Sequence, residues 1–282
     1  MSMKQLVLLL SFLGITATTI TSFHNNGLVS KPVHDIFEVI GFSGIASLEQ
    51  ANKQAQESLL RNGERWDCTE LTDLQKTIIK NREQLIGHLC QLGMIDETKP
   101  KNKNFMYAFL LGGTHERTKE RAHLLEELIK EGYAFQKIVL LSGARPLQDF
   151  EKYGLPQTVA TEAEMMHYVY DHSTLKDSQA ELILVNSPMK VVNGKQSRPT
   201  TDDTFKDFLV LNPHAGNCLV ISNNPYTQRQ VKVAQQLLPK TFSVEGAGSA
   251  ANKQKIDIIM ALDEFARTLY QELKTQSKLL NK

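Results

Sequence analysis

The sequence contains few cysteines, a single tryptophan and almost no excess charge. Among 282 residues there are three cysteines, and 32 basic side chains nearly balance 31 acidic ones, so the formal net charge is +1. A chain with this balance has no electrostatic reason to bind nucleic acid. With 41% hydrophobic and 22% charged residues, the composition is that of an ordinary globular protein. It excludes collagen, a coiled-coil rod and wholesale disorder.

Motifs of several well-known chemistries are also missing. The sequence has no Cys-x-x-Cys and no His-x-x-x-His, which argues against a structural zinc site. It has no Gly-x-Ser-x-Gly elbow, so a serine triad is disfavoured. The first glycine pair, Gly112-Gly113, belongs neither to a Gly-x-Gly-x-x-Gly loop nor to a Walker loop, which disfavours ordinary NAD or ATP binding. Cys218 lies in an apolar run, which indicates an inert core residue, whereas Cys68 and Cys90 are able to pair only if the protein is exported.

The N-terminus has the pattern of a secretory signal. Lys4 is followed by an almost wholly apolar run from Leu6 to Ile15, and small residues such as Ala17 and Ser22 come after it. A basic residue before about ten apolar ones is typical of a signal peptide. We expect residues 1–22 to be a signal peptide or an N-terminal anchor, and the protein to be exported or attached to the inner membrane. A buried strand or helix at the start of the fold is the alternative.

A helical segment is expected before the main domain. Residues 23–34 are polar and predict a linker. Residues 46–62 and 70–92 carry apolar side chains at helical spacing. We therefore expect residues 35–98 to form a helical unit without strands, with Trp66 in its core.

From residue 104 onward, short apolar runs alternate five times with helical stretches. The runs are residues 107–111, 137–141, 181–185, 218–221 and 241–244. They are continuous rather than alternating, which is typical of strands covered by helices on both faces. We expect residues 104–282 to form a doubly wound, mainly parallel five-stranded sheet, a Rossmann-like α/β fold. The fourth helix is expected to begin with Asn224 as N-cap and Pro225 as its first residue.

The expected topology selects candidate site residues. In an open parallel sheet, ligands bind beyond the carboxyl ends of the strands, where helix N-termini favour anions. The residues at those positions are Gly112, Gly113, Thr114 and Arg117 after the first strand, Ser142, Gly143 and Arg145 after the second, Arg198, Thr201 and Thr204 after the third, and Asn223 and Tyr226 after the fourth.

These candidates share a chemistry that suits a small anionic ligand. Glycines let the backbone approach, hydroxyls and amides donate hydrogen bonds, and arginine clamps phosphate or carboxylate in bidentate fashion. Arg117 lies in a first helical turn, where a cation opposes the helix dipole, and this unfavourable position indicates a binding role. Tyr226 is a candidate for stacking on a ring or donating its hydroxyl. Tight turns at the glycines are the purely structural alternative.

Three side chains are candidates for acid–base chemistry. Glu162 opens a helix, and its neighbour Glu164 is explained by a capping box. Asp203 follows Asp202 in another first turn, where it either complements the helix dipole or acts as a base or a divalent-cation ligand. His115 titrates near neutral pH. The sequence leaves open whether a divalent metal takes part.

The order and spacing of these stretches resemble the bacterial YdcF/SanA/ElyC-like family, a Rossmann-like group of largely undefined chemistry. The matching stretches are Leu111-Gly-Gly113 with Arg117, then residues 139–143, 161–166 and 201–204, and finally 220–222 with Arg229. The resemblance implies an envelope-related protein with Glu162 at the cleft and Arg229 among the ligand-binding residues. Family members usually carry Asn and Glu-Asn where this chain has Asp203, Lys206 and Asp207, and a His where it has Tyr226.

These observations leave three functions open. The first is an enzyme, a hydrolase or transferase, that acts on a phosphorylated or nucleotide-like small molecule. The second is a binding or regulatory module that has kept the cleft and lost the reaction, as the departures at Asp203, Lys206 and Tyr226 suggest. In the third, residues 35–98 are a docking surface and the α/β domain is only a platform.

Overall fold

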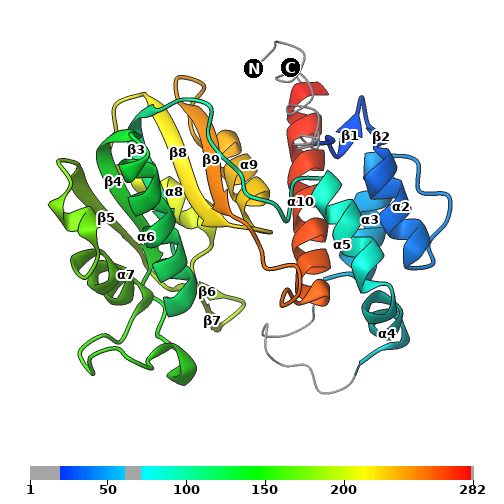
Figure 1. The fold of residues 1–282 in the computed structure, drawn as a ribbon, viewed down its shortest axis with the longest axis horizontal. Coiled ribbons are helices and arrows are strands. Elements are labelled where there is room, and N and C mark those ends of the chain that lie inside the picture. The colour runs from blue at the N-terminus through cyan, green and yellow to red at the C-terminus, as the bar shows by residue number, and fades with distance from the viewer. Residues whose placement is uncertain (1–19, 61–70, 281–282) are drawn as a thin grey trace, which may run out of the picture.

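The computed structural model describes residues 20–60 and 71–280 (Figure 1). Most of the expected signal peptide, as well as Trp66 and Cys68, lies outside the described residues. None of the helices in the described part of the chain has the length and apolar character that a bilayer span requires.

A five-stranded sheet whose strands are all parallel confirms the predicted fold class. Its order is β5-β4-β3-β8-β9. The strands are β3 (Asn104–Leu111), β4 (Ala134–Gly143), β5 (Glu181–Ser187), β8 (Asn217–Asn223) and β9 (Ser243–Ser249). The chain proceeds from β3 outward to β5 and then returns to the other side of β3 with β8. The carboxyl ends of β3 and β8 therefore form the topological switch point, where Rossmann-like folds bind ligands.

Helices cover both faces of this sheet (Figure 1). Helices α6 (His115–Lys130) and α7 (Glu162–Asp171) share one apolar core with Ala108 and Leu110 of β3. Helices α8 (Thr201–Val210) and α9 (Thr227–Leu237) share the other with Phe109. Successive strand residues point to opposite faces, so strands buried on both faces read as continuous apolar runs.

The interior position of Cys218 agrees with its predicted role. Its side chain is fully buried on β8 among the residues that face α8 and α9. Burial raises the pKa of the thiol to about 12, so the thiolate is not formed near neutral pH and Cys218 is inert.

The helical part begins earlier than the sequence predicted. The polar stretch at 23–34 is not a linker, because it forms a small hairpin and the first helix. Its elements are β1 (His24–Asn25), β2 (Leu28–Val29) and α2 (Lys31–Val39). Pro32 lies in the first turn of α2, where a missing N–H group costs no helical hydrogen bond.

The rest of the helical part, as far as the structure describes it, contains three helices. They are α3 (Leu48–Ser58), α4 (Asp73–Lys80) and α5 (Arg82–Gln91). The predicted helix at 70–92 is thus two helices, because Asn81 leaves the helical conformation between them.

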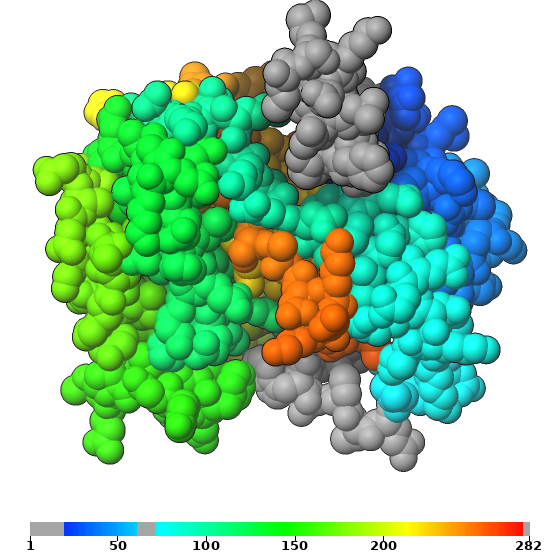
Figure 2. All heavy atoms as spheres, viewed as in Figure 1, coloured from blue at the N-terminus to red at the C-terminus, as the bar shows by residue number. Residues whose placement is uncertain are grey.

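The final helix, α10 (Ile258–Leu280), lies between the sheet and the helical part (Figure 1). Its apolar face, which includes Leu262, Phe265 and Leu269, is buried in one core with α2, α3 and α5. The same helix also contacts α9 of the sheet part. In the space-filling view, orange residues around the start of α10 lie between the cyan helical part and the green helices (Figure 2). The expected domain at 104–282 therefore shares its last helix with the core of the helical segment.

Two predicted boundaries at the end of the sheet are wrong. Strand β9 does not stop at Glu245 but pairs with β8 as far as Ser249. Its glycines allow close packing, because a Cβ on Gly248 would lie 2.1 Å from the Thr227 hydroxyl oxygen. Helix α9 begins at Thr227 with Tyr226 at the N-cap position, whereas Asn224 and Pro225 lie before it.

The position of α10 predicts the cost of truncating its core side chains. Phe265 is fully buried, and its ring centroid lies 5.9 Å from those of both Phe23 and Phe37. We expect Phe265→Ala to lower the free energy of unfolding by about 3–5 kcal/mol, because a large apolar side chain is lost from a packed core. Urea denaturation followed by circular dichroism measures this. The control, Tyr270→Ala on the exposed side of α10, should cost far less; equal losses would contradict the burial of this face.

Candidate functional site

A cleft of about 630 Å³ opens at the carboxyl ends of β3 and β4. Its wall combines loops after the strands with side chains from α6, α9 and α10. The predicted site residues that line it are Gly112, Gly113, Thr114, Arg117, Arg145, Glu162, Arg198, Thr201, Thr204, Tyr226 and Arg229. The volume is in the range of pockets that hold a small organic ligand.

Three predicted binding residues support the cleft from behind its wall. Ser142 is fully buried, and its hydroxyl donates to the carbonyl of Val185 at 2.7 Å. The N–H of Gly143 donates to Glu162 Oε2 at 3.2 Å, and a Cβ on this glycine would lie 2.2 Å from Pro199 Cγ. Asn223 is buried and binds a side chain of α6. These three residues support the loops of the cleft wall and do not line the cleft themselves.

His115 and Asp203, two of the catalytic candidates, are not among the residues that line the cleft. His115 is the first residue of α6 and is buried, and this burial lowers its pKa. Asp203 Oδ2 accepts from the backbone N–H of Thr200 at 2.7 Å and from its hydroxyl at 2.6 Å, and it pairs with Lys190. Burial alone would raise the pKa of Asp203, but these bonds outweigh it and hold the pKa below its usual value. Asp203 therefore caps α8 and ties down the loop before it.

The structure also limits the case for a bound metal. No cluster of three or more His, Cys, Asp or Glu side chains suited to a metal ion occurs in the described residues. The expectation of a divalent cation rested on Asp202 and Asp203, and the Asp203 carboxylate is committed to Thr200 and Lys190.

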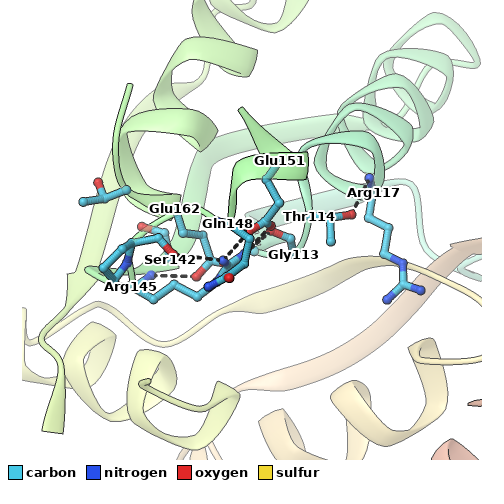
Figure 3. A network of polar contacts seen from close by, with 12 residues as sticks. Gly113, Thr114, Arg117, Ser142, Arg145, Gln148, Glu151 and Glu162 are labelled. Carbon is cyan, nitrogen blue, oxygen red and sulfur yellow. Dashed lines mark hydrogen bonds and ion pairs between the residues drawn. The ribbon is translucent and has the colours of Figure 1, made fainter. Parts of the chain in front are cut away.

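Arg145 is bound by the protein itself (Figure 3). Its Nη1 and Nη2 donate to the two oxygens of Glu151 at 2.7 and 2.8 Å, and Nη2 also donates to the carbonyl of Gly113 at 2.8 Å. Its Nε lies 3.3 Å from Glu162 Oε1. Burial lowers the pKa of Arg145, but the two carboxylates raise it above its usual value overall. Arg145 thus positions Glu162 and the glycine loop, and Glu151 is a partner that sequence analysis missed.

Glu162 is the carboxyl group best placed for acid–base chemistry. It opens α7 behind a Thr161 N-cap and reaches into the cleft beside Gly112. A Cβ on Gly112 would lie 2.8 Å from the Glu162 carboxyl carbon, so the loop needs glycine there. Burial raises the pKa of Glu162, and Arg145 and the Gly143 N–H only partly oppose this. A carboxyl with a raised pKa in a cleft suits proton transfer.

Arg121 is a buried residue of the cleft wall that the sequence analysis missed. It is buried on α6, where Nε and Nη2 donate to Asn223 Oδ1 at 3.1 and 2.9 Å, and Nη1 donates to the carbonyls of Leu111 and Gly112. All of these acceptors are neutral. Burial lowers the pKa of Arg121 to about 10, so it stays charged at neutral pH. A signal for it was present, because position 121 continues the apolar stripe of Leu125 and Leu128.

The Arg117 guanidinium group stacks on the Tyr226 ring at the α10 side of the cleft. The Arg117 guanidinium lies 4.5 Å from the centroid of the Tyr226 ring, and its Nη2 lies 3.3 Å from Met260 Sδ. The Tyr226 hydroxyl lies 2.8 Å from the same sulfur. Tyr226 is buried, and the predicted stacking of a ligand ring on this face is blocked by the Arg117 guanidinium. Met260 was missed because the sequence analysis chose candidates only after the first four strands, whereas Met260 lies on α10, which follows β9.

The remaining arginines differ in whether a carboxylate neutralises them. Arg229 pairs with the buried Glu264, and Arg267 pairs with Asp263 at 3.1 Å, both carboxylates coming from α10. Within residues 20–60 and 71–280, no ion pair with a carboxylate is formed by Arg117, Arg121 or Arg198. The cleft therefore carries excess positive charge, which suits an anion.

The pKa of Glu162 predicts a pH-dependent affinity for anions. Sulfate keeps its charge between pH 5 and 8, so a change of its affinity over this range comes from ionisation of the protein. We expect sulfate to bind about tenfold more tightly once Glu162 is protonated, because a neutral carboxyl no longer repels the anion. Affinity should thus rise as the pH falls through the raised pKa, and calorimetric titration measures it.

The matched variants separate Glu162 from other carboxylates. Glu162→Gln should bind sulfate tightly at every pH and flatten the dependence. Glu164→Gln removes a carboxylate two residues away while keeping the capping box, since Gln also serves there. This control should keep the wild-type slope; an unchanged slope in Glu162→Gln would contradict the assignment.

Comparison with known proteins identifies no relative of this chain. No protein-family model matches it, and no curated protein sequence matches it. The resemblance to the YdcF/SanA/ElyC-like family therefore stays a prediction that rests on the motifs alone.

Proposed function

We propose that this protein binds a phosphorylated or nucleotide-like small molecule in the cleft and acts on it. The observation that supports this most is the charge of the wall. Arg117, Arg121 and Arg198 line the cleft without an ion-pair partner in the described part of the chain, and Glu162 lies beside them. Guanidinium groups are the side chains best suited to phosphate oxygens.

The proposed binding mode uses the sheet's switch point. Phosphate oxygens accept from Arg117 and from the Nη2 group of Arg121, which has one N–H beyond its bond to Asn223. Thr114 caps α6 at the same loop, so the N-terminus of α6 faces the cleft as well. These donors are held by the fold before the ligand arrives, and preorganised donors stabilise charge that develops during phosphoryl transfer.

Glu162 supplies the acid–base step in this proposal. In hydrolysis it takes a proton from the attacking water while the phosphorus–oxygen bond to the leaving group breaks, and in transfer it takes the proton from an acceptor hydroxyl. Arg145 and the Gly143 N–H orient the carboxylate. Its raised pKa brings it nearer to the working pH of a general base.

A binding module without a reaction is the second candidate. This function is favoured because both carboxylate oxygens of Glu162 already have partners within the protein. Oε1 faces Arg145, and Oε2 accepts a hydrogen bond from the Gly143 N–H. Asp203 is likewise used as a helix cap. In this case the cleft senses or holds its anion, and the carboxylate serves only to position the loops.

Loss of a single cleft arginine tests the proposed ligand class. We expect Arg117→Gln to weaken binding of a nucleoside 5′-monophosphate at least tenfold, because a charge-assisted hydrogen bond is lost. Lys119→Gln is the control, since it removes one charge from the exposed side of the same helix and should bind as the wild type does. Calorimetric titration gives both affinities. If Arg117→Gln binds the nucleotide as tightly as the wild type does, Arg117 is not a phosphate-binding residue.

A turnover assay on the same proteins separates the two candidates. Wild type, Glu162→Gln and Lys119→Gln are incubated with a panel of phosphate esters, with and without Mg²⁺. Product formed by wild type and Lys119→Gln but not by Glu162→Gln would reject the binding-only function. Saturable binding with no product from any ester would reject the enzyme.

We also propose that the protein is exported or anchored to the membrane through residues 1–22, in the context of a bacterial envelope. The basic and apolar pattern of that segment supports this, and the envelope context comes from the family resemblance. Fractionation of bacteria that produce the full chain should place it in the periplasm or membrane. A variant without residues 2–22 should stay in the cytoplasm; identical distributions would contradict the proposal.

A further inference from the structure

The arginines of the cleft that form no ion pair within the described residues come from two parts of its wall. Arg117 and Arg121 come from one face of α6, and Arg121 binds the ends of β3 and β8. Arg198 comes from the segment before α8, next to Pro199, which packs on Gly143 at the end of β4. We call the first pair the α6 arginines. In Figure 3, Arg117 extends away from the cluster around Arg145 and Glu151.

Electrostatic neighbours show the same division. The charges that act on Arg121 include Arg117, Arg229 and Glu162. Arg198 acts on Glu151, which is bound to Arg145 on the β4 side. Glu162 acts on Arg121 and also pairs with Arg145. It is therefore close both to the α6 arginines and to the Arg145–Glu151 pair on which Arg198 acts.

The width of the sheet sets the separation of these regions. β4 and β8 lie on either side of β3, so their ends are two strand spacings apart, roughly 10 Å. A single phosphate group bound by the α6 arginines is too small to contact Arg198 as well. Two linked phosphoryl groups cover more of this distance and present oxygens to both sides.

Arg198 lines the cleft, is exposed to solvent and forms no ion pair within the described residues. Its guanidinium group is therefore available to a second phosphoryl group without first breaking a contact with a carboxylate.

We infer that the ligand of this cleft is an organic diphosphate, with one phosphoryl group at the α6 arginines and the other at Arg198. This inference rests on the proposed phosphate-binding function and narrows its ligand class. The cleft volume of about 630 Å³ also leaves room for the organic part of such a molecule. Arg198 is then the residue that selects diphosphates over monophosphates.

The test compares inorganic phosphate with methylenediphosphonate, whose P–C–P link resists hydrolysis, so that binding is measured without turnover. We expect the wild type to bind the diphosphonate at least tenfold more tightly, because a second set of charge-assisted bonds forms. Arg198→Gln should remove this preference while changing phosphate affinity little. Arg117→Gln should weaken the binding of both anions.

Two further variants control for charge and folding. Lys195→Gln removes an exposed charge from the hairpin of β6 (Lys190–Val192) and β7 (Lys195–Ser197), three residues from Arg198, and should keep the preference. Arg198→Lys keeps the positive charge and should keep part of the preference for the diphosphonate. This variant still tests the inference if Arg198→Gln does not fold.

The outcomes separate the two proposals. If neither anion binds to the wild type, the proposed phosphate-binding function fails. If both bind equally well, or if the preference survives in Arg198→Gln, the diphosphate inference fails while phosphate binding stands. A preference lost equally in Lys195→Gln would show general charge attraction and would also overturn the inference.

Discussion

The buried guanidinium group of Arg121 links the strand ends from which the cleft wall is built. It joins α6 to the end of β3, through the carbonyls of Leu111 and Gly112, and to the end of β8, through Asn223. Burying a cation costs several kcal/mol unless its bonds are satisfied. Here neutral acceptors satisfy most of the bonds and leave the charge uncompensated, so the same group that fixes the strand ends also makes the site positive.

The C-terminal helix controls how much of the cleft's positive charge stays available. Asp263 and Glu264 of α10 are buried and neutralise Arg267 and Arg229, while Arg117 rests on Tyr226. Since the opposite face of α10 is part of the helical core, the cleft is built jointly by both parts of the molecule. A displacement of α10 would change the charge balance in the cleft as well as the packing of the helical segment.

Sequence patterns predicted the fold well and the site in part. Continuous apolar runs identified all five strands, and the strand-end positions, together with Glu162 and Arg229, identified about half of the cleft wall. The patterns could not show which polar side chains are already bound by other groups of the protein. Arg145 looked like an anion ligand, yet Glu151 and Glu162 bind it; Asp203 looked like a base, yet it caps α8. Glu151 lies only six residues after Arg145, and Thr200 only three residues before Asp203. Which of these neighbouring side chains meet depends on the path of the loop between them, and apolar periodicity does not encode that path.

The amino-acid sequence alone determined the α/β class, the parallel direction of the strands and the edge of the sheet at which the cleft opens, because hydrophobic periodicity and strand-end position are local properties. Only the tertiary structure decided the boundary of β9, the place of α10 in two packing surfaces, and the division of arginines into paired and unpaired ones. These features depend on contacts between residues far apart in the chain, such as Arg121 with Asn223 and Arg229 with Glu264. The free energy of a charge is set by these neighbours and by burial, and not by its own position in the sequence.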